Sequence, residues 1–372
     1  MPRFFTRRSL FQASGAFAIS GLIPLDSVSA WATPAEAGRV RVNFNENAWG
    51  PSVAVRPAIE HALAQISRYG DAAAAQALVE QIAAYERVSP EQVIPGEILV
   101  ALGFYLGTHG GPGGEFLYST PGYLALIDAA RNVGGVGIGV PLNAAYENDL
   151  AGIAERITPR TRAIFLVNPH NPTGTVNEPD ALLRFAREAS RHALVIVDEA
   201  YLDYVSDFAQ RSAVSLVREG ANVLVFRTFD KIHGLAGLPI GYALVPREIG
   251  KALRAEGLGD AESLGRINIA AASAALADTD HVARVRAAVL GEREKWNAVL
   301  DELKLRHTAS HANFIFFDGG RPHNEIASAF AARGVDVARV FPPFDTWIRI
   351  TIGLPEENLR VQQVLRGIFA RA

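Results

Sequence analysis

The sequence predicts an α/β protein with a mainly parallel sheet between helices, followed by a smaller C-terminal α/β domain. Three short apolar runs carry this prediction, at residues 163–167, 194–197 and 223–226. Each run is rich in aliphatic residues and has no charged side chain, which is typical of parallel strands buried on both faces. The chain of 372 residues is 49% hydrophobic and 20% charged. This composition supplies a large core and excludes a disordered chain.

The three runs end at polar residues. The first run stops at Asn168-Pro169, and Asn177-Glu178-Pro179 then begins a helix that extends to about residue 190. The second run ends at Asp198 and the third at Arg227-Thr228. Because parallel sheets bind their ligands at the carboxyl ends of the strands, we expect the functional site at these three ends.

From about residue 264 the pattern of short apolar runs alternating with helices changes. A long helical stretch extends to about residue 305 and leads into two apolar runs at 313–317 and 347–351. We therefore place a small C-terminal domain at 264–372, a large domain at 72–263 and an N-terminal arm at 33–71.

The N-terminus resembles an export signal of the twin-arginine type. Arg7 and Arg8 precede an apolar stretch at about 13–25, and small residues around Ala30 and Ala32 offer cleavage positions. The stretch is too short for a stable membrane span. We expect residues 1–32 to be a signal peptide and the mature protein to be periplasmic, without a membrane anchor. The alternative is a disordered basic leader.

The composition excludes several classes of site. The net charge of -3 gives no basic face, so we expect no nucleic-acid partner. The chain has no cysteine, which excludes disulfides, zinc ribbons and cysteine nucleophiles. His307 and His311 form the one His-x3-His pair and lie in an expected loop, so we expect no metal site.

Lys231 is distinctive among the four lysines of the chain. It lies in an apolar, glycine-rich loop after the third run, whereas Lys295, for example, lies among charged residues. Desolvation there would lower its pKa, as a Schiff-base or proton-transfer lysine needs. The alternative is a lysine at a loop edge whose amine reaches solvent.

Two other strand ends offer polar side chains. Asp198 could hold a protonated heterocycle, bind a metal or cap the next turn. Asn171 lies in a turn rich in proline and glycine and could be purely structural. The segment at 110–114 resembles a phosphate loop only superficially and predicts a turn, because it lacks the Gly-Lys-Ser/Thr ending.

Taken together, three motifs resemble those of the fold-type I pyridoxal-phosphate aminotransferases. These motifs are Asn-Pro-x-Asn-Pro-Thr-Gly at 168–174, Asp-Glu-Ala-Tyr at 198–201, and Lys231. Within that group the sequence is most similar to histidinol-phosphate aminotransferase. The likeness covers the chain from about residue 41 to the C-terminus, and includes the segments Asn45–Ser52, Arg68–Asp71, Pro121–Tyr123 and Ile348–Gly353.

The resemblance implies a role for each cofactor residue. Lys231 would form a Schiff base with pyridoxal 5'-phosphate and move the substrate proton. Asp198 would keep the pyridine nitrogen protonated, so that the ring acts as an electron sink. Tyr201 and Asn171 would hydrogen-bond the phenolic oxygen of the ring, and Tyr123 would stack on its face.

The resemblance also implies the remaining contacts. Thr228 and Tyr69, the latter reaching across from the partner subunit, would bind the cofactor phosphate, which implies a homodimer. Arg349 would hold the substrate α-carboxylate as a bidentate pair. Asn47 and Arg339 would also bind substrate, although Arg339 is one residue out of register with its counterpart in the family.

This chain departs from the family pattern at the positions that would bind the cofactor phosphate. Asp230 precedes the lysine where the family has serine, and Pro239 stands where it has arginine. The usual glycine-rich phosphate loop of the family is shortened to Pro95-Gly96-Glu97 in this comparison. Arg227 and His233 are candidate replacements for the missing phosphate ligands.

The leading functional hypothesis is an aminotransferase that moves an amino group between an amino acid, or an amino-acid-like amine, and a 2-oxo acid by a ping-pong mechanism. The alternatives are a decarboxylase, racemase or oxygen-using oxidase on the same fold, and an exported binding protein without catalysis. An exported protein is displaced from cytoplasmic histidine synthesis, so we do not expect histidinol phosphate itself to be the substrate.

Overall fold

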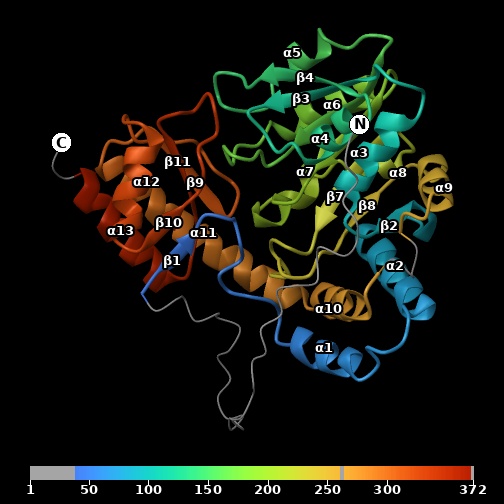
Figure 1. Ribbon diagram of the computed structural model, residues 1–372, viewed down its shortest axis with the longest axis horizontal. Helices are drawn as coiled ribbons and strands as arrows, with labels where there is room; N and C mark the ends of the chain where they lie inside the picture. The colour runs from blue at the N-terminus through green and yellow to red at the C-terminus, as the bar shows by residue number, and fades with distance from the viewer. Residues whose placement is uncertain (1–37, 260–263, 370–372) are drawn as a thin grey trace, which may run out of the picture.

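The computed structural model describes residues 38–259 and 264–369, and a seven-stranded sheet organises its larger part (Figure 1). The strand order is β2-β8-β7-β6-β5-β3-β4. The strands are β2 (Val93–Pro95), β3 (Glu115–Thr120), β4 (Val136–Pro141), β5 (Thr161–Val167), β6 (Leu194–Asp198), β7 (Val223–Thr228) and β8 (Gly241–Leu244).

The sheet is mainly parallel, as predicted. β4, β3, β5, β6 and β7 form successive parallel pairs, and β8 is antiparallel to both β7 and β2. The three predicted runs are β5, β6 and β7, so their carboxyl ends lie side by side at one edge of the sheet.

The two faces of the sheet bury separate hydrophobic cores because side chains alternate along each strand. Val195 and Val197 of β6 pack into one core, whereas Leu194 and Ile196 pack into the other. The first core includes α1 (Val55–Leu63), α2 (Ala72–Glu86), α6 (Pro179–Ala189), α8 (Val214–Arg218) and α10 (Arg266–Ala277). The second includes α3 (Ile98–Thr108), α4 (Ala125–Asn132) and α9 (Arg247–Ala255).

A further core surrounds two short sheets. β1 (Val40–Val42) pairs in parallel with β10 (Val335–Val337), and β9 (Phe314–Asp318) pairs antiparallel with β11 (Trp347–Thr351). This core includes α11 (Thr279–Glu302), α12 (His323–Ala331) and α13 (Pro355–Phe369). The remaining short helices are η1 (Pro90–Gln92), α5 (Leu150–Ala154), η2 (Leu202–Tyr204) and α7 (Phe208–Arg211).

The long helical stretch predicted after residue 264 is two helices, α10 and α11, separated at Asp278. The backbone of Asp278 leaves the helical region with φ -93° and ψ 73°. Its carboxylate accepts hydrogen bonds from the His281 backbone N–H at 2.9 Å and from the Ser52 hydroxyl at 2.5 Å. A helix N-cap therefore interrupts the apolar pattern.

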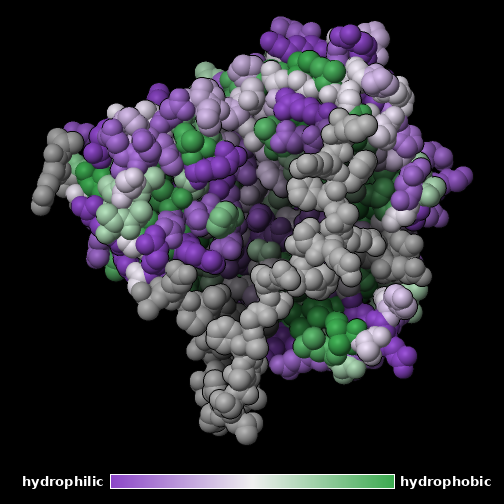
Figure 2. Space-filling model, in the orientation of Figure 1, coloured by the Kyte–Doolittle hydropathy of each residue, from purple (hydrophilic) through white to green (hydrophobic). Residues whose placement is uncertain are grey.

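The surface carries one local hydrophobic patch of interest. Figure 2 shows hydrophobic side chains gathered over α1, and Val53, Leu63 and Ile66 are exposed there. Within residues 38–259 and 264–369 no helix combines the length and apolar character needed to cross a bilayer. The expected signal peptide at 1–32 lies outside the described residues.

Candidate active site

A cavity of about 110 Å³ lies at the carboxyl ends of β5, β6 and β7. Six side chains predicted to hold the cofactor line it together, although they come from segments far apart in the sequence. Its lining consists of Glu97, Leu99, Val100, Tyr123, Ala125, Val167, Asn171, Asp198, Ala200, Tyr201, Phe226, Thr228, Asp230 and Lys231.

Lys231 lies in a tight turn after β7. The turn is closed by a hydrogen bond from the Gly234 backbone N–H to the Lys231 carbonyl at 3.0 Å. Gly234 has φ +71°, and a Cβ at this position would lie 2.5 Å from the Gly50 carbonyl carbon. Glycine therefore allows the N-terminal segment to lie directly against the lysine turn.

Asp198 is a buried carboxylate at the end of β6, 3% exposed. Its Oδ1 accepts a hydrogen bond from the Ala200 backbone N–H at 3.0 Å. Burial raises its pKa to about 7, against the lowering effects of that hydrogen bond and of Lys231. Such a carboxylate gains most from a cationic partner inside the cavity.

Tyr201 is positioned by a residue that the sequence did not single out. The Asn45 side-chain N–H donates to the Tyr201 hydroxyl oxygen at 3.1 Å. Thr351 of β11 fixes Asn45 in turn, because its hydroxyl oxygen accepts from the Asn45 backbone N–H at 2.9 Å. Since the tyrosine oxygen already accepts, its own proton is free to be donated into the cavity.

Arg349 lies beside the cavity and is connected to it by Asn171. Its Nη1 donates to the Asn171 Oδ1 at 2.6 Å, and its Nη2 donates to the Asn43 carbonyl at 3.0 Å. The guanidinium lies near the rings of Phe314 and Phe341, at 5.3 and 4.8 Å. Its buried Nε has no hydrogen-bond partner among the described residues, and burial lowers the pKa of the guanidinium to about 10. A ligand carboxylate would satisfy both the charge and the free donor.

The other two predicted substrate residues lie differently. Arg339 is exposed, lies over the Phe341 ring at 4.5 Å and is close enough to lower the pKa of Arg349. Asn47 is engaged within the protein: its amide donates to the Ile232 carbonyl at 2.9 Å and accepts from the Trp49 N–H at 3.0 Å. Asn47 therefore fastens the N-terminal segment to the lysine turn.

The end of the cavity near α3 is acidic. Glu97 and Asp230 both line it, together with Thr228 and the first turn of α3. Burial raises the pKa of both carboxyl groups, and the charge of Asp230 raises that of Glu97 further. In the part of the chain that the structure describes, Oδ1 of Asp230 is buried without a hydrogen-bond partner. An anion there would meet Thr228 and the N–H groups at the start of α3 as donors, and two carboxyl groups that oppose its binding.

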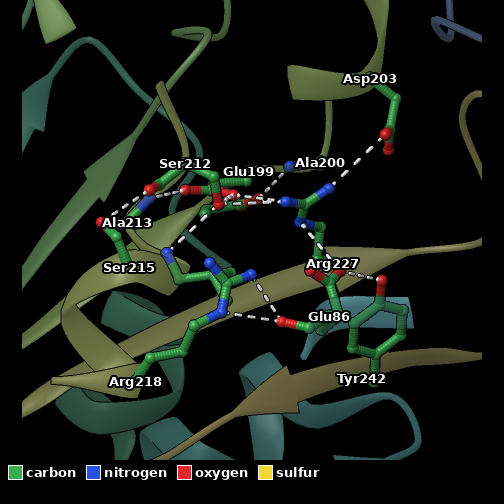
Figure 3. Close-up of polar contacts among 12 residues, drawn as sticks. Glu86, Glu199, Ala200, Asp203, Ser212, Ala213, Ser215, Arg218, Arg227 and Tyr242 are labelled. Atoms are coloured by element: carbon green, nitrogen blue, oxygen red, sulfur yellow. Dashed lines mark hydrogen bonds and ion pairs between the residues drawn. The ribbon is translucent and has the colours of Figure 1, made fainter. Parts of the chain in front are cut away.

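Arg227 does not replace the missing phosphate arginine, so that expectation is wrong. Its guanidinium lies away from the cavity, among three carboxylates (Figure 3). It is 3.0 Å from Glu199, 3.5 Å from Asp203 and 3.7 Å from Glu86. Since Arg227 and Thr228 are neighbours on β7, only Thr228 can point into the cavity.

His233 does not line this cavity either, although the sequence offered it as a phosphate ligand. It lines a different cavity next to Phe229, and its ring centroid lies 5.0 Å from that of Phe229. Tyr69, expected at the phosphate of a partner subunit, is 93% exposed and does not line the cavity of its own chain.

Comparison with known proteins identifies the family. The family described as "Aminotransferase class I and II" matches residues 40–362. The chain belongs to this family.

Individual relatives agree with that assignment. The histidinol-phosphate aminotransferase of Moorella thermoacetica is 36% identical over 338 residues, which cover 89% of this chain and 86% of the relative. The aromatic amino acid aminotransferase of Mycolicibacterium vanbaalenii is 35% identical, covering 86% and 90%. The crystal structure of histidinol-phosphate aminotransferase from Sinorhizobium meliloti with pyridoxal-5'-phosphate superposes with a TM-score of 0.79 at 26% identity, covering 89% and 91%.

The protein is therefore an enzyme, an aminotransferase that depends on pyridoxal 5'-phosphate. The side chains present fit this cofactor. A lysine amine, a buried carboxylate without a cationic partner other than that lysine, and a tyrosine hydroxyl with a free proton converge on one cavity. The predicted fold class is also confirmed.

Substitution of Asp198 by Asn should stabilise the cofactor-free protein while abolishing turnover. Because folding raises the pKa of Asp198 from 3.8 to about 7, its ionised form is penalised in the folded state. That penalty is absent below pH 4 and complete above pH 7. D198N should therefore exceed the wild type in free energy of unfolding by a few kcal/mol at pH 8 and match it at pH 4. Urea unfolding at both pH values measures this, and an equal difference at the two values would contradict it.

Removal of acidic charge near α3 should tighten cofactor binding. We expect E97Q and D230N each to lower the dissociation constant of pyridoxal phosphate about tenfold, because each removes a charge of the same sign as the phosphate.

Pro239→Arg should also tighten binding of the cofactor, since a charge-assisted hydrogen bond contributes roughly 1.5–3 kcal/mol. Fluorescence titration of cofactor-free protein measures all three, with Glu356→Gln on α13 as the control. Dissociation constants that stay at the wild-type value would refute the acidic-end interpretation.

Proposed function

We propose that the enzyme transfers an amino group from an amino acid with a ring-bearing side chain, or a related amine, to a 2-oxo acid. The observation that carries the proposal is Arg349, a buried guanidinium between Phe314 and Phe341 with a free Nε, joined to the cavity by Asn171. Arg339 also lies over the ring of Phe341 and offers a second positive charge to a substrate side chain. The names of the relatives, which act on histidinol phosphate and on aromatic amino acids, agree with this class of donor.

The proposed roles of the residues follow from their positions. When bound, pyridoxal phosphate supplies the electron sink that makes the substrate Cα proton acidic. Lys231 Nζ would carry that proton from the substrate Cα to C4′ of the cofactor in the first half-reaction, and would carry a proton in the reverse direction in the second. The Asp198 carboxylate would hold the proton on the pyridine nitrogen, and the Tyr201 hydroxyl would donate to the phenolic oxygen of the bound cofactor. Arg349 orients the substrate through its carboxylate.

A substrate screen tests this proposal. Purified enzyme with added pyridoxal phosphate is given 2-oxoglutarate and one amino donor at a time, from aromatic amino acids and histidinol phosphate to alanine and lysine. We expect glutamate to form fastest with the ring-bearing donors. We expect Arg349→Gln to raise KM for every donor about a hundredfold, and Arg339→Gln to raise it only for donors with a second anionic group. Equal rates for all donors would contradict the proposed specificity.

Lys231→Ala should lose both turnover and the absorbance band of the lysine-bound cofactor. The amine is both the covalent attachment point and the proposed proton carrier, so its removal should cost several orders of magnitude in kcat. Lys251→Ala, an exposed lysine on α9, should behave as the wild type. Visible absorbance spectra and steady-state rates measure both variants. A lysine-bound band in Lys231→Ala would show that another lysine carries the cofactor.

We propose that the enzyme is a homodimer whose Tyr69 reaches the cofactor phosphate of the partner subunit. The exposure of Tyr69 and the apolar patch over α1 support this arrangement, because exposed patches rich in apolar side chains mark interfaces.

Disruption of the α1 patch should therefore impair the site. We expect Ile66→Asp to yield monomers with weakened cofactor binding, and Tyr69→Phe to remain dimeric yet bind the cofactor about tenfold more weakly. Tyr105→Phe, on α3, is the control for loss of a tyrosine hydroxyl. Analytical ultracentrifugation and cofactor titration report both effects. A fully active wild-type monomer at assay concentration would refute the shared site.

We also propose export of the enzyme by a twin-arginine signal at residues 1–32, followed by action in the periplasm. The arginine pair, the apolar stretch and the small residues near Ala30 and Ala32 support it. A twin-arginine route would suit an enzyme that folds around its cofactor before transport.

A further inference from the structure

Asn45 is a buried residue whose backbone lies in the left-handed region, with a φ of 57° and 1% exposure. Two residues from distant parts of the chain hold this backbone. The Thr351 hydroxyl oxygen accepts from the Asn45 N–H at 2.9 Å, and the Asn313 side-chain N–H donates to the Asn45 carbonyl at 3.1 Å. Left-handed residues other than glycine cluster at active sites, where the surrounding contacts maintain them.

The side-chain amide of Asn45 has a defined direction because of Thr351. The Thr351 oxygen already accepts from the Asn45 backbone, and its single proton is donated to the Asn45 Oδ1 at 3.2 Å. The amide N–H₂ group therefore faces Tyr201 and donates to its hydroxyl oxygen at 3.1 Å. A reversed amide would place an acceptor against Tyr201 and take away the acceptor that Thr351 uses among the described residues.

The direction of these bonds determines where the Tyr201 proton goes. Its oxygen accepts from Asn45, and within residues 38–259 and 264–369 its proton is donated to no protein group. Tyr201 lines the active-site cavity, so the proton is available to a ligand there. Three donors thus follow one another in a single direction, from Thr351 through Asn45 to Tyr201. Successive hydrogen bonds of this kind polarise one another and strengthen the last donor.

The first donor lies on the strand that carries Arg349. Thr351 and Arg349 are two residues apart on β11 and therefore share one face of it. Arg349 Nη2 donates to the carbonyl of Asn43, two residues before Asn45, at 3.0 Å. The segment 43–45 is thus fixed to β11 at both of its ends, and this strand sets the position of Asn45 against Tyr201.

We propose that Asn45, oriented by Thr351, is a positioning residue for amino transfer, because it directs the Tyr201 proton toward the phenolic oxygen of the bound cofactor. This inference rests on the proposed role of Tyr201. A hydrogen bond donated to the phenolic oxygen withdraws negative charge from it, so the nitrogen that joins the cofactor to Lys231 holds its proton less tightly. Loss of the donated bond should strengthen that proton binding.

Asn45→Asp tests the direction of the proton. Asp tolerates the left-handed backbone as Asn does, but it presents an acceptor where Asn presents N–H₂, and so takes the Tyr201 proton away from the cavity. The measurement is the absorbance of the lysine-bound cofactor against pH. We expect N45D to raise the midpoint of this titration by about one pH unit, as Tyr201→Phe does, which is a tenfold change in proton affinity. Asn324→Asp, exposed on α12, is the matched control and should titrate as the wild type.

A double variant separates this effect from that of the added charge. In the Tyr201→Phe background there is no hydroxyl proton to redirect, so N45D should leave the midpoint of Tyr201→Phe unchanged. A carboxylate that acted only through its charge would shift both backgrounds equally. Thr351→Val releases the amide and should raise the midpoint by a smaller amount. Thr351→Ser keeps the hydroxyl and should restore the wild-type midpoint.

Three results overturn the proposal: a wild-type midpoint in N45D, an equal shift by N45D with and without the Tyr201 hydroxyl, or a wild-type midpoint in Thr351→Val. A wild-type midpoint in Tyr201→Phe would remove the role of Tyr201 and this inference with it. The class of amino donor is tested separately by the substrate screen, so its failure leaves these titrations unaffected.

Discussion

The buried ion-pair network of Arg227 is the constraint on which the active-site edge of the sheet depends. This one guanidinium, 4% exposed, lies among Glu86 of α2, Glu199 after β6 and Asp203 of η2 (Figure 3). It holds a helix, a strand end and a turn against β7. Removing a cation from such a cluster leaves buried carboxylates uncompensated, at a cost of roughly 3–5 kcal/mol.

The same network divides the acidic groups of this region into two sets. Glu199 is paired with Arg227, whereas its neighbour Asp198 lines the cavity, where Lys231 is the one cation among the described residues that lowers its pKa. Because successive side chains point in opposite directions along an extended chain, Glu199 joins the structural ion-pair network while the adjacent Asp198 faces the cavity. At the end of the cavity near α3, the lining formed by the described residues contains Glu97 and Asp230 and no arginine. If the cofactor phosphate lies there, we expect its retention to be coupled to proton uptake, because lower pH neutralises the two carboxyl groups.

The sequence predicted the elements whose signals are local. The apolar runs of β5, β6 and β7 and the polar residues at their ends required no knowledge of distant contacts, and the lysine was singled out by its apolar loop. The sequence could not reveal Asn45, which contacts Tyr201 across 156 positions of chain, or the direction in which Arg227 points. The break between α10 and α11 was missed although part of its signal is local, because Asp278 caps α11 by accepting from the His281 N–H, and only the further bond from Ser52 comes from a distant part of the chain. Long-range polar contacts of this kind leave no periodic pattern in the sequence.

The central claim is that the cavity around Lys231 carries out amino transfer and not another reaction of the same cofactor. A single-turnover experiment without an oxo-acid acceptor tests it most directly, with enzyme loaded with pyridoxal phosphate in excess over an aromatic amino donor. The account predicts one equivalent of 2-oxo acid per equivalent of donor consumed, with the amino group retained on the enzyme until 2-oxoglutarate is added. Release of carbon dioxide, of free ammonia with hydrogen peroxide, or of the opposite enantiomer of the donor would contradict it.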